Sequence, residues 1–378
     1  IIDGRLVAAA QQERFSRKKH DDSFPIDAIN SCLKLGGIEE SQLDAVVFYD
    51  KPLLKFERIL ITHIATWPTS LPSFLKAMPV WLKRKLWVSR TIAKELPEYK
   101  GPILFSAHHL SHAASAFYGS GFDEAAILTV DGVGEWATCT LAHGQGKKLT
   151  MLKEIRFPHS LGLLYSTITG LLGFRVNSGE YKVMGLAPYG EPSYVESLRK
   201  LLKQHTDGSF SLDLRYFGYI GGLKMFNHRL PKLLGIEPRM PESPIEQKHM
   251  NLARSIQVVT EEVMMGLARS AQSLTGSKNL CLAGGVALNC VANARILKDG
   301  PFDDIFVQPS AGDAGGAIGA AAYVSHGVYG DPRRPLEHVY LGPEYGDSDC
   351  RRFVQEHSLA HQYFDDEGEL IDAVVERL

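Results

Sequence analysis

The residues best suited to chemistry are two histidines four positions apart, His108 and His112, in the run HHLSHAASA at 108–116. The apolar residues 103–105 before this run predict a strand, and the residues from 110 onward favour a helix. On a helix, positions i and i+4 lie on one face, so both imidazoles could reach a single metal ion. An isolated pair with this spacing more often packs against or caps a helix, so the metal interpretation needs further ligands.

Two aspartates in glycine-rich turns could supply those ligands. Asp131 lies in VDGVG at 130–134, and Asp313 lies in SAGDAGG at 310–316. Two imidazoles and two carboxylates form a ligand set suited to Fe(II), Mn(II) or Zn(II).

Glycine turns follow three predicted strands, at 131–132, 284–285 and 312–313. Glycine lets backbone N–H groups approach an oxyanion, and a following helix N-terminus favours negative charge. There is no G-x-x-x-x-G-K-[ST] loop, and no G-x-G-x-x-G follows a strand. Each turn alone could be a plain turn, but together they look like the phosphate loops of the actin, Hsp70 and sugar-kinase ATPase fold.

Hydrophobic periodicity predicts alternating strands and helices. The meander after 131 and the strand–helix–strand run from 279 to 324 should share one mixed sheet. Residues 52–99 read as a helical insertion, for which amphipathic packing is favoured over an RNA or membrane contact. Three weaker predictions are a strand at 5–11, a non-helical glycine-rich segment at 177–190 and a strand at 361–364 between two helices.

The composition is ordinary for a globular protein, with 378 residues, 44% hydrophobic and 22% charged. The net charge of −2 indicates no general attraction to nucleic acid or to an anionic membrane. Five cysteines without a C-x-x-C pair indicate reduced thiols and a cytoplasmic protein. No apolar run has the length of a membrane span, and no signal peptide is visible.

Five motifs together resemble the NodU/CmcH-type O-carbamoyltransferases, which carbamoylate nodulation factors, cephalosporins and aminoglycosides. They lie at 108–116, 130–135, 179–190, 283–289 and 308–320. The resemblance extends from residue 3 to about residue 346, and the motifs HHLSHAAS, VDGVGE and GEYKVMGLAPYG occur in the expected order.

The resemblance implies an α/β protein with a duplicated actin/Hsp70-like (ASKHA, ribonuclease H-like) fold. The first half would span 1–120, with the helical insertion at 52–99, and the second half 121–345. Residues 346–378 would begin a linker or a truncated C-terminal domain. Because the family's first strand and its YrdC-like domain are not found, the chain is expected to be a fragment.

The resemblance also assigns roles to individual residues. It implies a divalent metal, with Fe(II) expected first and Mn or Zn as alternatives, held by His108, His112, Asp131 and Asp313. The transfer-site lysine falls on Lys19, in the stretch ERFSRKKH. The residues expected to contact the nucleotide are Gly132, Gly134, Gly179, Glu180, Lys182, Gly285, Asn289 and Gly312.

The expected function is the core of an ATP-dependent O-carbamoyltransferase. Carbamoyl phosphate and ATP would form a carbamoyl-adenylate, whose carbamoyl group passes to a hydroxyl of a small-molecule or sugar acceptor. The metal would act as a Lewis acid, and Lys19 would stabilise negative charge. No general base is assigned, although His109 and His20 are candidates. No nucleic-acid or membrane partner is expected, and the oligomeric state, a homodimer included, is left open.

Two alternatives remain. One is a tRNA threonylcarbamoyl transferase-like enzyme, which the His pair and the aspartates also allow. The other is a non-catalytic nucleotide-binding switch of the actin or Hsp70 type. Metal content distinguishes the second alternative from a carbamoyltransferase, because the actin and Hsp70 ATPases hold Mg²⁺ through phosphates and need no histidine pair.

Overall fold

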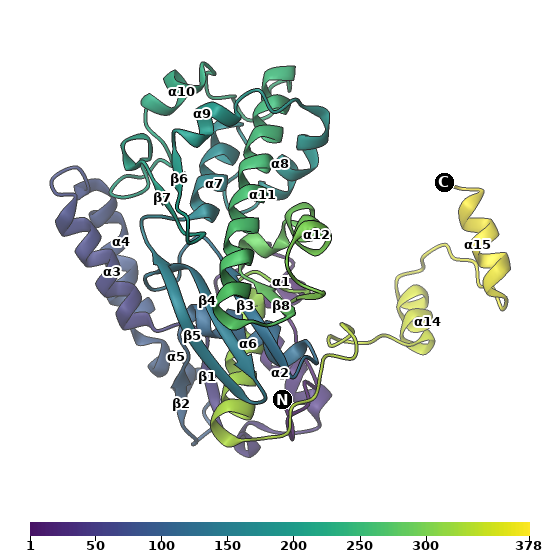
Figure 1. Ribbon diagram of the computed structural model, residues 1–378. Coiled ribbons are helices and arrows are strands. Elements are labelled where there is room, and N and C mark those ends of the chain that lie inside the picture. The colour runs from purple at the N-terminus through teal and green to yellow at the C-terminus, as the bar shows by residue number, and fades with distance from the viewer.

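A mixed five-stranded sheet lies at the centre of the computed structural model, which describes residues 1–378 (Figure 1). The strands are β3 (Glu124–Val130), β4 (Ala137–Gln145), β5 (Lys148–Arg156), β8 (Asn279–Ala283) and β9 (Asp304–Val307). Their order is β5-β4-β3-β8-β9. The first three strands form an antiparallel meander, whereas β3, β8 and β9 run parallel. The prediction of one mixed sheet is confirmed.

Helices cover both faces of the sheet, and the side chains of β3 show why. Alternate residues of a strand point to opposite faces. Ala126, Leu128 and Val130 belong to the larger core cluster, whereas Ala125 and Ile127 belong to the smaller one. The helices over the first face are α7 (Leu161–Leu171), α11 (Gln247–Thr275) and α12 (Cys290–Asp299), and those over the second are α6 (His108–Gly119) and α13 (Ala314–Ala322).

The parallel strands end at the same edge of the sheet. Asp131 follows β3, Gly285 follows β8, and Asp313 lies at the start of α13, in the loop after β9. Ligand sites in α/β proteins form at this edge, outside the carboxyl ends of the strands. A separate two-stranded parallel sheet pairs β1 (Val46–Phe48) with β2 (Ile103–Phe105), and α6 begins three residues after β2.

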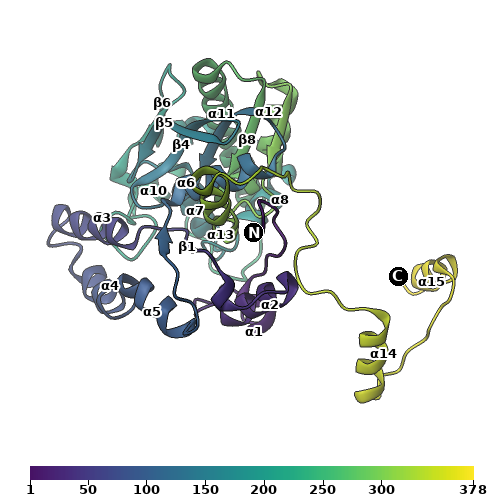
Figure 2. The same ribbon diagram turned by 90° about the horizontal axis from the view of Figure 1, so that it is seen from below.

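Residues 52–99 are helical, as the sequence predicts. They contain α3 (Pro52–Ala65), α4 (Leu71–Lys83) and α5 (Val88–Glu95). Pro52 occupies the first turn of α3, where its missing N–H costs no hydrogen bond. These helices lie together at one side of the body in both views (Figures 1 and 2).

The predicted strand at 5–11 is wrong. This segment runs beside the chain at 331–341, where Ala9 donates its N–H to the carbonyl of Leu341. Pro332 and Pro335 in the facing segment have no N–H to donate, so a regular ladder cannot form there.

The prediction that 177–190 avoids ordinary helix is also wrong in part, because α8 (Glu180–Leu186) is an α-helix. Gly179 precedes this helix, and Gly185, its interior glycine, faces open space. Val183 is fully buried, so packing outweighs the glycine cost of about 1 kcal/mol.

The strand predicted at 361–364 is absent too, since no other segment pairs with it. The flanking helices α14 (Asp347–Glu356) and α15 (Glu367–Val375) have no buried residue and lie apart from the body in both views (Figures 1 and 2).

No helix of the chain is both long enough and apolar enough to cross a membrane. The remaining α-helices and strands are α1 (Gln12–Ser16), α2 (Ile26–Gly36), α9 (Val195–Arg199), β6 (Leu202–Gln204), β7 (Phe210–Leu212) and α10 (Arg229–Leu234).

Candidate metal centre

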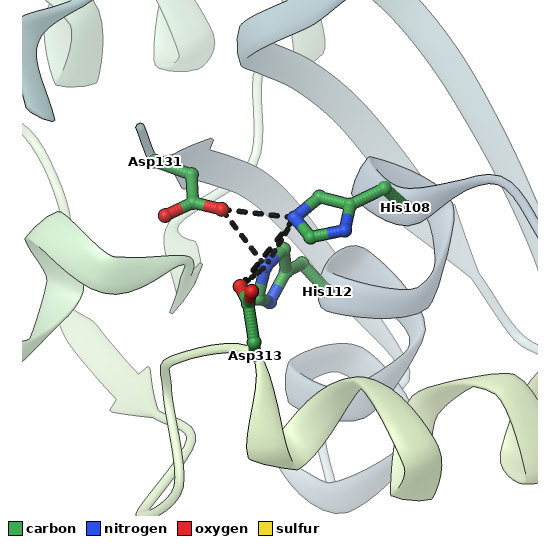
Figure 3. Close-up of side chains that lie close together, drawn as sticks. All are labelled: His108, His112, Asp131 and Asp313. Atoms are coloured by element: carbon green, nitrogen blue, oxygen red, sulfur yellow. Dashed lines mark hydrogen bonds and ion pairs between the residues drawn. The ribbon is translucent and has the colours of Figure 1, made fainter. Parts of the chain in front are cut away.

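The structure brings His108, His112, Asp131 and Asp313 together at the carboxyl edge of the sheet (Figure 3). One ligand atom from each lies within 4.8 Å of the others. The Nε2 atoms of the two histidines are 3.1 Å apart, and Oδ2 of Asp131 is 2.9 Å from His108 Nε2 and 3.4 Å from His112 Nε2. Asp313 Oδ1 is 3.6 Å from each of these nitrogens.

Close packing of α6 against α13 determines this geometry. Both histidines project from one face of α6, and Asp313 immediately precedes α13 (Figure 3). A Cβ on Gly319 would lie 1.7 Å from the carbonyl oxygen of Ser111, so only glycine permits this approach. The small residues of α13 therefore have a structural purpose, which is to bring Asp313 to the histidines.

His108 is held from three sides, and the sequence assigned no role to two of the residues involved, Asp50 and Glu135. Its Nδ1 lies 2.9 Å from Oδ1 of Asp50, whose other oxygen pairs with Lys55 at 2.7 Å. Its backbone N–H donates to both carboxylate oxygens of Glu135. A Cβ on Gly134 would lie 2.9 Å from the His108 ring, so this position too must be small.

The hydrogen-bonding pattern around His108 requires positive charge at the centre. If Nδ1 donates to Asp50, a neutral ring presents its Nε2 lone pair to the carboxylate of Asp131 at 2.9 Å. In the absence of an ion, a proton on Nε2 removes the repulsion between this lone pair and the carboxylate. Burial lowers the pKa of His108, but the Asp131 and Asp50 carboxylates outweigh burial and raise it to about 10. A divalent cation would satisfy the same four atoms.

The spacing of the donor atoms fits such a cation. Metal–ligand bonds of about 2.1 Å place neighbouring ligand atoms about 3.0 Å apart in an octahedron and about 3.4 Å apart in a tetrahedron. The separations of 2.9, 3.1, 3.4 and 3.6 Å lie close to these values. The residues therefore fit a divalent ion, whose donor set allows Fe(II), Mn(II) or Zn(II).

The two aspartates differ in exposure. The Asp131 side chain is 13% exposed, whereas that of Asp313 is 59% exposed. Burial opposes charge on Asp131, but hydrogen bonds from the two histidines hold its pKa well below the usual range. Its other oxygen, Oδ1, accepts the N–H of Gly285 at 3.1 Å. The centre is therefore closed on the Asp131 side and open on the Asp313 side.

His109, a candidate general base, faces away from this opening. It is buried, and its Nδ1 lies 2.6 Å from the hydroxyl of Thr129. Burial, together with positive charge on His108, lowers its pKa to about 3. These contacts indicate a structural role for His109.

The residues predicted to contact the nucleotide lie in three places. Gly132, Gly134, Gly285 and Gly312 are in the turns around the metal centre. Asn289 caps α12 through the N–H of Ala292 and exchanges two hydrogen bonds with Gln257. Gly179 precedes α8, and Glu180 and Lys182 lie in its first turn. Glu180 accepts hydrogen bonds from Ser166 and Asn177, and the exposed Lys182 lies over the ring of Phe174.

Lys19, predicted at the transfer site, is exposed and outside the cluster of four. It lies in a turn after α1, between Arg17 and His20, which both have positive φ. His20, the other candidate base, is exposed, and its N–H donates to Glu13. The structure does not bring either side chain into the group around His108 and His112.

Comparisons with known proteins agree with the sequence motifs. Residues 1–322 match the family described as "Carbamoyltransferase N-terminus". An uncharacterized protein of Synechocystis sp. is 51% identical over 97% of this chain and 62% of its own length. Nodulation protein NolNO of Sinorhizobium fredii is 37% identical over 92% of this chain and 48% of NolNO. The chain thus spans about half to three-fifths of these relatives.

Similarity to solved structures is low. Component A of the (R)-2-hydroxyglutaryl-CoA dehydratase of Acidaminococcus fermentans is 12% identical, with a TM-score of 0.42. The match covers 85% of this chain and 90% of that one.

Proposed function

The chain belongs to the carbamoyltransferase family whose N-terminal region matches residues 1–322, and from this premise we propose that it is the transfer core of an ATP-dependent O-carbamoyltransferase. Carbamoyl phosphate, water and ATP would give a carbamoyl-adenylate with release of phosphate and pyrophosphate. The adenylate would then pass its carbamoyl group to a hydroxyl of a small-molecule or sugar acceptor, with AMP as the leaving group. The observation that carries the proposal is the convergence of His108, His112, Asp131 and Asp313 at the carboxyl edge of the sheet.

The surrounding residues would fix the ligands and leave one side open. Asp50 and Glu135 orient His108, and the Gly285 N–H orients Asp131. The exposed carboxylate of Asp313 borders the open side, from which substrate oxygens would approach. A divalent ion bound there, Fe(II) first and Mn or Zn as alternatives, would supply a Lewis acid for the carbamoyl oxygen.

We also propose the duplicated actin-like arrangement, with halves at 1–120 and 121–345. The parallel pair β1–β2 followed by α6 supports the first half. The meander of β3 to β5 with the parallel strands β8 and β9 supports the second. In this arrangement the turns at 284–285 and 312–313 would hold nucleotide phosphates through backbone N–H groups. Lys19, which the motif places at the transfer site, would stabilise negative charge on the donor.

The test is a transfer assay with the full-length protein, ¹³C-carbamoyl phosphate, ATP and a panel of hydroxyl acceptors. The nodulation proteins among the relatives, NolNO and NolO, support including nodulation-factor-type sugars beside antibiotics. The carbamoylated product, detected by ¹³C NMR, should require both ATP and the metal ion. Product formed without ATP would contradict the adenylate route, and transfer to tRNA alone would favour the threonylcarbamoyl alternative.

A further inference from the structure

A cavity of about 220 Å³ adjoins the turn that carries Asp131. It lies between α3, the chain around Phe157 and the loop at 219–222. Val133 and Leu163 line it, and Leu163 Cδ2 is 3.9 Å from the position that a Cβ would take on Gly132. A group bound in this cavity would therefore lie beside the turn that carries Asp131.

The cavity contains a buried arginine without a partner. Arg58 is 8% exposed, its Nε is enclosed and has no hydrogen-bond partner, and its guanidinium lies 5.1 Å from the centre of the Phe157 ring. Burial lowers the pKa of Arg58 to about 10, against the opposing effect of Asp50 and Glu135, so the side chain stays charged at neutral pH. An unpaired charge in such a position is costly, which points to an anionic ligand.

The two nearest carboxylates are already engaged elsewhere. Asp50 pairs with Lys55 and with the ring of His108. Glu135 accepts the backbone N–H groups of His108 and Lys51. Neither carboxylate forms an ion pair with Arg58, so its planar donor groups remain available to a carboxylate from outside.

A second polar group without a partner, His63, lines the same cavity. His63 is 9% exposed, its Nδ1 has no hydrogen-bond partner, and burial lowers its pKa, so the ring is neutral. Other polar groups of the lining are satisfied: Tyr219 donates its hydroxyl hydrogen to Pro158, and Ser73 donates to Gly221. Among the side chains of the lining, Arg58 and His63 are therefore the two with a buried polar atom that has no partner.

We propose that this cavity is the acceptor subsite and that it binds a carboxylate carried on an apolar body, with Arg58 as its principal partner. A single arginine beside a neutral histidine matches one negative charge, and half of the twelve lining residues are hydrophobic. One guanidinium can form one bidentate pair, which a carboxylate satisfies with its two oxygens. The cavity is smaller than the roughly 300–1,000 Å³ of a drug-sized site, so it holds part of the acceptor. The assignment to the acceptor, but not the carboxylate binding itself, rests on the proposed function.

Binding can be measured without any transfer activity. The probes for the 378-residue chain are 4-fluorobenzoate, its neutral analogue 4-fluorobenzamide, and inorganic phosphate, with ¹⁹F NMR as the readout. Fluorobenzoate should bind saturably and at least about tenfold more tightly than the amide, as expected for a charge-assisted hydrogen bond. Phosphate should not displace it. Equal binding of the amide, displacement by phosphate, or no binding of fluorobenzoate would overturn the proposal.

Three variants assign the binding to Arg58. Arg58→Met should weaken fluorobenzoate binding by about tenfold or more, and Arg58→Lys should restore part of it because the charge is kept. Arg90→Met removes an exposed arginine from the same insertion and should bind like wild type. Unchanged binding by Arg58→Met would refute the assignment.

Thermal unfolding separates a binding role from a structural one. Removing an unpaired buried charge should leave the midpoint of Arg58→Met unchanged or raise it. A fall of more than about 5 °C in Arg58→Met, but not in Arg58→Lys, would make Arg58 the counter-ion of the buried carboxylates and overturn the proposal. The metal content of the protein is measured separately and does not depend on fluorobenzoate binding. A protein that binds metal but not fluorobenzoate would therefore contradict the subsite proposal alone and leave the carbamoyltransferase assignment standing.

Discussion

The backbone N–H of Gly285 donates a 3.1 Å hydrogen bond to Oδ1 of Asp131, so the turn after β8 fixes the carboxylate that follows β3. A Cβ on Gly285 would lie 2.9 Å from the same oxygen. Gly284, at φ +92°, leaves no room for a side chain either, because a Cβ there would be 2.3 Å from the carbonyl oxygen of Val130. A turn that the sequence suggests for phosphate binding therefore also contacts a candidate metal ligand.

Gly285→Ala should weaken metal binding. The added methyl group would displace the Asp131 carboxylate, and such changes around a metal ligand typically lower affinity by about tenfold or more. Metal titration of the purified chain measures this loss. Gly285→Val should also lower the affinity for ATP analogues by at least about tenfold, if the turn holds a phosphate.

The control is Gly185→Ala in α8, where a Cβ meets no atom within 4 Å. This variant should keep its metal and gain about 0.5–1 kcal/mol of stability, because alanine favours the helix. If both glycine variants bound metal like wild type, the contact between Gly285 and Asp131 would have no part in the site.

Asn289→Ala should destabilise the fold whether or not nucleotide is bound. The substitution removes the cap of α12 and two of the hydrogen bonds of the buried Gln257 amide, which keeps its bonds to Glu261 and Tyr165. Together these losses should lower the free energy of unfolding by roughly 1–3 kcal/mol. Urea unfolding measures it. An unchanged stability combined with weaker ATP-analogue binding would instead support the nucleotide role predicted from the motif.

Much of the five-stranded sheet and its helices could be predicted from the sequence, because local patterns determine these elements. Short apolar runs predict β3 and β8, and a helical hydrophobic period predicts α11. Each of these patterns lies within one short stretch of the sequence. The proximity of His108 to His112 follows from helix geometry alone. Their proximity to Asp313 depends on a contact between Gly319 and Ser111, which no local pattern reveals.

Asp50 and Glu135 escaped prediction for the same reason. Asp50 follows β1, 58 residues before its partner His108, and nothing in FYDKP marks it as a metal-site residue. Glu135 lies within the VDGVGE motif, but its partners are backbone N–H groups of other segments. Position alone was a general signal, since Asp50 lies two residues after β1 and ligand sites of α/β proteins form outside the carboxyl ends of strands.

Asp50→Asn should lower metal affinity by about 10–100-fold while the fold persists. The carboxylate orients His108 and increases the basicity of its ring, and both effects weaken with a neutral amide. The buried ion pair with Lys55 is lost as well. Metal titration measures the affinity, and circular dichroism of the same variant shows whether the fold persists.

Glu124→Gln is the matched control, because Glu124 holds His143 at 2.7 Å on an exposed part of the sheet. It should bind metal like wild type. Equal affinity in Asp50→Asn and Glu124→Gln would mean that Asp50 contributes nothing to the centre.

His112→Ala should lose the ion and, in the full-length protein, the transfer activity. The variant removes one of four ligands, and the strands and helices around it keep their own packing. His109→Gln tests the neighbouring ring: it should keep the ion but lose roughly 1–3 kcal/mol of stability, because His109 is buried and bonded to Thr129. Elemental analysis of both variants, purified without chelator, gives the answer.

Stability in the presence of metal provides a second readout for His112→Ala. An ion that binds only the folded chain stabilises it by about 2.7 kcal/mol at a free concentration about 100 times Kd. Wild type and His109→Gln should therefore unfold at a higher temperature with Fe(II), Mn(II) or Zn(II) than with chelator. His112→Ala should show no such rise, because the remaining nitrogen and two carboxylates bind the ion much more weakly. The same rise in both histidine variants would place the ion away from His112 and defeat the four-ligand centre.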